Sequence, residues 1–145
     1  MTSEYRDDYP TCLRTYASVR ILSEHMTAGE MAELLGIQPS RSQTKLNDGR
    51  HKPRLHGWFL SSEKVVASRD LRRHLDWLLD QLLPVSGVLH PLIESGDVSA
   101  DVVCYWVSAS GHGGPTLSVV QLEKMCKLGV GCWFDVYFDA DASAD

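Results

Sequence analysis

The sharpest chemical feature of the sequence is a glycine-rich segment, Ser108-Ala-Ser-Gly-His-Gly-Gly-Pro-Thr116, between an apolar run and a helix start. Backbone N–H groups at Gly113 and Gly114 could point at an anion beside the helix N-terminus, where the helix dipole favours negative charge. The segment also supplies four short polar side chains: Ser108, Ser110, His112 and Thr116. We therefore expect either an anion-binding loop or a tight turn in which glycine provides positive φ angles.

The segment does not match the established phosphate or oxyanion loops. It lacks the Gly-Lys-Ser/Thr ending of a P-loop and the G-x-G-x-x-G of a dinucleotide site. Its His-Gly-Gly run is not accompanied by the G-x-S-x-G elbow of lipases. The six histidines are scattered without i, i+4 pairs, and no C-x-x-C pair occurs, so we expect no metal and no cofactor.

Charge and cysteine usage indicate a soluble cytoplasmic protein. The formal net charge is −5, which makes nucleic acid an unlikely partner, although residues 41–56 form a locally basic segment. The N-terminus lacks the apolar region of a signal peptide, and no apolar run is long enough to span a membrane. The four cysteines are expected to be buried free thiols in a reducing compartment.

The positioning elements can be placed from periodicity and capping signals. Alternation predicts strands, and helical spacing with capping boxes at Thr27 and Ser118 predicts helices. Pro84 is expected to break or kink the helix that begins near Leu71. The predicted order is strand 15–22, helix 28–35, strand 40–46, strand 57–62, helix from 71, helical stretch 85–95, strand 101–108, helix to 128 and strand 132–138.

This order predicts one α+β domain over residues 12–139, with a frayed tail at 1–11 and an acidic tail at 140–145. The first six elements match the split βαββαβ pattern of ferredoxin-like folds, and an extra αβ unit extends it. Helices would cover one face of a mainly antiparallel sheet, with strand 101–108 covered on both faces. The opposite sheet face would carry a mixed polar and aromatic set: Tyr16, Ser18, Arg20, Trp133, Asp135 and Tyr137.

Several sequence blocks together resemble one known family. The blocks are Thr15-Tyr-Ala-Ser-Val-Arg20, Glu33-Leu-Leu-Gly36, Pro39-Ser-Arg41, Gly57-Trp-Phe-Leu-Ser-Ser-Glu63, His74-Leu-Asp-Trp-Leu78, Tyr105-Trp-Val-Ser-Ala-Ser-Gly-His-Gly-Gly-Pro115 and Phe134-Asp-Val-Tyr-Phe138. They resemble the bacterial family catalogued as domain of unknown function 4279, over about residues 14–138. The resemblance implies a compact cytoplasmic domain and no particular reaction. The site candidates shared with its pattern are Trp58, Glu63, His74, Trp106, Ser108, His112 and Asp135.

Three functional hypotheses follow. We favour a non-enzymatic binding module that recognises a protein partner, as immunity or adaptor proteins do, or a small anionic ligand at the glycine-rich loop and the aromatic sheet face. The second hypothesis is an enzyme acting on a small phosphorylated or carboxylated substrate. His112 would be its acid/base, oriented by Glu63 or Asp135, and Gly113 and Gly114 would hold an oxyanion. The third is a structural homodimer through the open sheet face.

Overall fold

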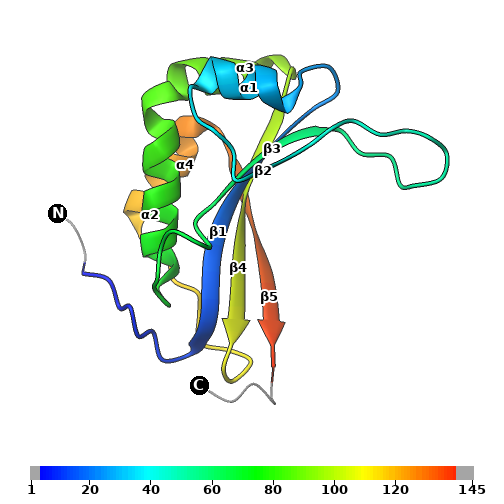
Figure 1. Cartoon of the computed structure of the whole chain (residues 1–145). Helices are drawn as coiled ribbons and strands as arrows, with labels where there is room; N and C mark the ends of the chain where they lie inside the picture. The colour runs from blue at the N-terminus through cyan, green and yellow to red at the C-terminus, as the bar shows by residue number, and fades with distance from the viewer. Residues whose placement is uncertain (1–3, 140–145) are drawn as a thin grey trace.

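A computed structural model describes residues 4–139 of the chain. It consists of one five-stranded sheet with helices on one side (Figure 1). The elements in chain order are β1 (Cys12–Ser23), α1 (Ala28–Leu35), β2 (Arg41–Gln43), β3 (His56–Ser61), α2 (Leu71–Leu82), a 3₁₀ turn (Leu83–Val85), α3 (Ser86–Ser95), β4 (Ser99–Ser108), α4 (Val119–Leu128) and β5 (Gly131–Phe138). The acidic tail predicted at 140–145 lies outside the described residues.

The helices begin and end where the capping signals predict. The Thr27 side chain accepts a hydrogen bond from the N–H of Glu30, and Gly36 ends α1 in the left-handed conformation. Ser118 and Gln121 form the predicted capping box of α4. Pro84 breaks the second helix as expected, since it lies in the 3₁₀ turn that separates α2 from α3.

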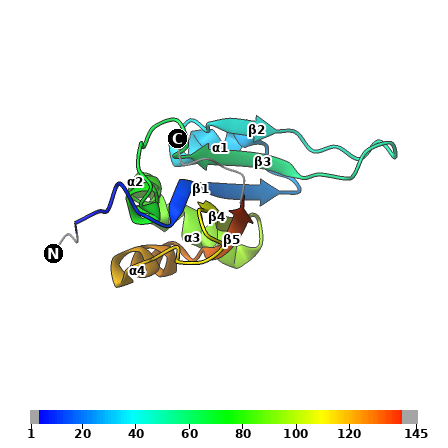
Figure 2. The ribbon, with the colours of Figure 1, turned by 90° about the horizontal axis from the view of Figure 1, so that it is seen from below.

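The sheet has the strand order β2-β3-β1-β4-β5. All neighbouring strands are antiparallel except β4 and β5, which are parallel and joined by the crossover helix α4. The predicted α+β class and mainly antiparallel sheet are therefore confirmed. The further assignment to the ferredoxin-like class stays a prediction. Between β2 and β3 the basic segment extends away from the rest of the domain (Figures 1 and 2).

The core lies between the sheet and the helices. Alternate residues of β1, among them Val19 and Ile21, are buried together with Trp58 of β3 and the leucine stripe of α2. The prediction that β4 is covered on both faces is wrong, because Val103, Tyr105 and Val107 are only partly buried. The sheet consequently has one closed face and one open face.

The N-terminal segment, residues 4–11, lies against α2 and the glycine-rich loop. The N–H of Arg6 donates to the Asp70 carboxylate at 2.7 Å, and the Tyr5 hydroxyl donates to Asp76. Burial and this hydrogen bond raise the pKa of Tyr5 to about 12. At the other end, the Tyr9 and Thr116 hydroxyls are 2.7 Å apart. From residue 4 onward, the segment that we expected to be frayed thus contacts both α2 and the glycine-rich loop.

Two further expectations concern the cysteines and membrane association. Cys12 and Cys104 are buried free thiols as predicted, whereas Cys126 and Cys132 are exposed. The Cys132 sulfur nevertheless lies 3.6 Å from that of Cys104, on the helix side of the sheet. No helix within residues 4–139 combines the length and apolar character needed to cross a bilayer.

His74 of α2 is a buried structural residue. Its Nε2–H donates to the Ser68 carbonyl oxygen at 2.8 Å, so the neutral ring presents Nδ1 to the Ser62 hydroxyl, 2.7 Å away. That hydroxyl in turn accepts the N–H of Ala17 in β1. Burial lowers the pKa of His74 below its ordinary value of 6.5. The imidazole therefore joins α2 to the sheet in its uncharged form.

We predict that His74→Ala lowers the free energy of unfolding by about 2–4 kcal/mol, because it leaves a cavity and removes two buried hydrogen bonds. Denaturant titration measures this loss. Because the folded-state pKa of His74 is depressed, the unfolded chain binds more protons below pH ~6.5, and wild-type stability should fall as pH drops through that range. The variant should lack this part of the pH dependence. Substitution of the exposed His25 by Ala is the control and should change stability by less than about 0.5 kcal/mol.

Candidate functional site

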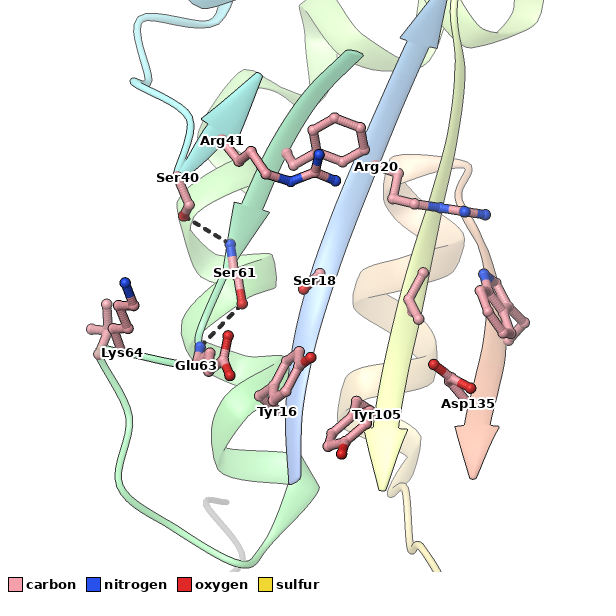
Figure 3. A pocket seen from close by; sticks show the side chains of 14 residues that line it. Tyr16, Ser18, Arg20, Ser40, Arg41, Ser61, Glu63, Lys64, Tyr105 and Asp135 are labelled. Carbon is pink, nitrogen blue, oxygen red and sulfur yellow. Dashed lines mark hydrogen bonds between the residues drawn. The ribbon is translucent and has the colours of Figure 1, made fainter. Parts of the chain in front are cut away.

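The open face of the sheet contains a concavity with a volume of about 480 Å³. Its floor comes from β1, β3 and β4, and β5 closes one side (Figure 3). The opposite side is formed by β2 and by the turn after β3, where the N–H groups of Val65 and Val66 donate to the Ser62 carbonyl. We call this concavity the sheet groove.

Aromatic rings and guanidinium groups cover the groove floor. The Tyr16 and Tyr105 rings stack with centroids 4.6 Å apart, because the two residues are directly paired between β1 and β4. The Arg41 guanidinium lies 4.1 Å from the centre of the Phe59 ring, its partner in the β2–β3 register. Such cation–π contacts hold a charged side chain over an apolar ring without burying the charge.

Two of the charged residues that line the groove, Arg20 and Glu63, form ion pairs. Arg20 donates two hydrogen bonds to Asp101, at 2.8 and 2.7 Å, and this pairing raises the pKa of its guanidinium. Glu63 accepts from Arg14. Within residues 4–139, Arg41 and Lys64 form no ion pair with a carboxylate. The side of the groove formed by β2 and the turn after β3 is therefore positively charged.

The side of the groove at β5 has the opposite character. Asp135 accepts a hydrogen bond from the Tyr137 hydroxyl at 3.2 Å, and this bond raises the pKa of Tyr137. Trp133 lies beside it, with the Arg20 guanidinium 5.3 Å from its ring centre. On the floor, burial and then the nearby Glu63 raise the pKa of Tyr16, so its phenol stays protonated at neutral pH. Hydroxyl donors and one carboxylate thus lie across the groove from Arg41.

Part of this site follows from the sequence. Alternation places Tyr16, Ser18, Arg20, Trp133 and Asp135 on one sheet face, and all five line the groove. Sequence reasoning missed the contribution of the other strands, which is made by Ser40, Arg41, Phe59, Ser61, Lys64 and Tyr105. The pattern Phe59-Leu-Ser61 alternates and could have placed Phe59 opposite Arg20. Nothing local could have predicted that Arg41 lies over that ring.

The glycine-rich loop lies at one end of the sheet. Hydrogen bonds within the loop and from the N-terminal segment hold its conformation. The buried Ser108 hydroxyl accepts the N–H groups of Ser110 and Gly111 and donates to the His112 carbonyl. The Thr11 hydroxyl donates to the Gly113 carbonyl at 2.6 Å. A Cβ on Gly113 would lie 2.5 Å from the Thr11 methyl group. The N-terminal segment therefore occupies the space beside the predicted anion loop.

The remaining sequence candidates do not gather at one point. Trp58, Trp106 and His74 are buried in the helix-side core. His112 is exposed, and among residues 4–139 no hydrogen bond or ion pair joins it to Glu63 or Asp135. Within this described part of the chain, no three His, Cys, Asp or Glu side chains cluster as a metal site requires. The contacts on which the enzyme hypothesis depends are thus not found there.

We predict that Gly113→Ala destabilises the protein by about 2–4 kcal/mol, because positive φ and the clash with Thr11 both oppose a methyl group. Gly111→Ala is the matched control: its φ is also positive, at 85° against 96°, but the nearest atoms, those of Phe138, lie at an ordinary 3.6 Å. Thermal unfolding of both variants should show the larger loss at Gly113. Equal losses would mean that Thr11 does not pack against the loop.

The comparison with protein families identifies the chain. No curated protein and no solved structure matches it. A family model described as Domain of unknown function (DUF4279) matches residues 13–139, which include every strand of the sheet except the first residue of β1, and the whole sheet groove. The resemblance noted in the sequence is confirmed: the chain belongs to the DUF4279 family.

Proposed function

We propose that this domain is a ligand-binding module whose sheet groove takes a small planar organic anion, a ring that carries a carboxylate or a phosphate. The observation that carries the proposal is the Arg41 guanidinium, which lies 4.1 Å from the Phe59 ring centre at the edge of an aromatic floor and has no ion-pair partner among residues 4–139. Arginine is well suited to such ligands, because its planar fork of donors matches carboxylate and phosphate oxygens.

Charge supports an anion on this side of the groove. Arg41 and Lys64 both line it. The acidic groups there are Glu63, which Arg14 neutralises, and Asp135, which belongs to the β5 side. A ligand anion would therefore meet two cations before it meets an uncompensated acid. Hydrogen bonds to charged groups contribute roughly 1.5–3 kcal/mol each.

The aromatic floor of the groove suits a planar ligand. The stacked Tyr16 and Tyr105 rings offer an apolar surface next to Ser18 in the same concavity (Figure 3). A volume of about 480 Å³ falls within the range of small-molecule sites. Asp135 across the floor would accept a hydrogen bond from a donor on the far end of the ligand. Binding, rather than catalysis, is the role that this set of groups supports.

We predict saturable binding of phenyl phosphate and benzoate, and weaker binding of inorganic phosphate, which cannot use the aromatic floor. Isothermal titration calorimetry measures the three affinities. Arg41→Gln should weaken phenyl phosphate binding by about ten- to a hundredfold, the equivalent of one charged hydrogen bond.

Arg50→Gln is the matched control, since it removes the same charge from an exposed position in the basic segment between β2 and β3, outside the groove. It should leave the affinity within about twofold, because screening weakens a distant exposed charge. If both variants lost affinity equally, the basic segment as a whole, and not Arg41 in particular, would attract the anion. If none of the three anions bound to the wild type, the proposed ligand class would be wrong.

A further inference from the structure

The outer edge of β5 is a long exposed strand edge. β5 is the last strand of the sheet, eight residues long, and within residues 4–139 no strand pairs with its outer side. Such an edge presents unpaired N–H and C=O groups that can hydrogen-bond to another strand. The opposite edge strand, β2, has only three residues and carries Arg41. The two edges of the sheet therefore differ in what they offer to a partner.

β5 lacks the usual protection of an edge strand. Its sequence, Gly-Cys-Trp-Phe-Asp-Val-Tyr-Phe, contains no lysine and no proline, and its pairing with β4 is continuous without a bulge. Asp135 is its one charged residue, and it lines the groove. Lysine, proline and bulges are features by which solitary domains normally prevent strand pairing, so their absence from β5 favours pairing.

Apolar side chains are exposed on both faces of the strand. The exposed fractions are 41% for Trp133, 45% for Phe134, 52% for Val136, 49% for Tyr137 and 56% for Phe138. These five residues occur within six consecutive positions. A pairing strand would therefore bury apolar surface above and below the new hydrogen bonds, and each 100 Å² so buried contributes about 2.5 kcal/mol.

We propose that β5 pairs with β5 of a second copy of this chain, antiparallel and about a twofold axis, so that two sheets join into one. A twofold interface requires a surface that is complementary to itself. The strand meets this requirement in the register that places Phe134 opposite Phe134 of the second copy. Cys132 then faces Val136 on the helix side, and both members of each pair are apolar.

Charge selects between the possible registers. Centring the pair on Asp135 would place two carboxylates directly opposite each other, which is unfavourable. Centring it on Phe134 instead places Asp135 of the second copy opposite Trp133. The Arg20 guanidinium, which also pairs with Asp101 of its own chain, lies 5.3 Å from that ring centre. The register that separates the two acids is thus also the one that brings each acid toward a cation.

This pairing uses the outer backbone edge of β5 and leaves the groove floor uncovered, so it does not require a bound ligand. It also differs from a dimer formed face to face through the open sheet, which would close the groove. In the edge-paired dimer, Trp133 and Asp135 of each copy would form adjoining walls of two grooves on one continuous sheet.

Sedimentation velocity of the wild type over a concentration series tests the proposal. We expect a monomer–dimer equilibrium that is largely dimeric at about 100 μM, as for a dissociation constant in the micromolar range. Val136→Lys places a charge within the paired edge and should weaken dimerisation at least about tenfold, since burying an unpaired ammonium is costly. Phe134→Lys is a second variant at the centre of the same edge.

Leu34→Lys is the matched control, because Leu34 of α1 is 50% exposed, nearly as much as Val136, and α1 packs toward β3 rather than β5. It should dimerise like the wild type, and circular dichroism should show all three variants folded. A wild type that stays monomeric at about 100 μM would overturn the proposal. So would a dimer that both β5 variants leave intact, or one that Leu34→Lys dissociates equally.

Discussion

Within residues 4–139 the four α-helices lie on one face of the sheet, and the rest of the structure depends on that asymmetry. The helix side buries the large apolar residues of β1, β3 and α2 in a continuous core. The other face has no covering layer, so its side chains must be compatible with water and still protect the strands. Stacked tyrosines and arginines over aromatic rings meet both requirements. The same arrangement leaves a concave, polar and aromatic surface.

The helix layer is held in place by a small set of buried polar contacts. Asp70 caps α2 and also accepts the N–H of Arg6, while Asp76 accepts from Tyr5, Gln121 and Lys124. Burial opposes ionisation of Asp76, but these hydrogen bonds hold its pKa below the ordinary value. One carboxylate thereby joins the N-terminal segment, α2 and α4. The N-terminal segment continues to the glycine-rich loop, where the Thr11 hydroxyl donates to the Gly113 carbonyl.

Local patterns in the sequence predicted the elements and the two sheet faces. Period-two alternation in β1 and β5 placed Tyr16, Arg20 and Asp135 correctly, and capping boxes located α1 and α4, because these signals act within a few residues. The contacts that define the groove act over longer distances. Arg41 reaches Phe59 only through the β2–β3 register, and Thr11 meets Gly113 across about a hundred residues of chain. No local pattern encodes such pairings. This is why the sequence indicated the glycine-rich loop more clearly than the groove.

We propose that the open sheet face, rather than the glycine-rich loop, is the binding surface. A ¹H–¹⁵N correlation spectrum recorded during titration with phenyl phosphate tests it most directly, because each backbone amide reports its own surroundings. We expect residues 110–114 to stay unchanged, while progressive shifts appear for the groove amides, those of Ser18, Arg20, Arg41, Ser61 and Tyr105. Shifts confined to residues 110–114 would contradict it and return the site to the glycine-rich loop.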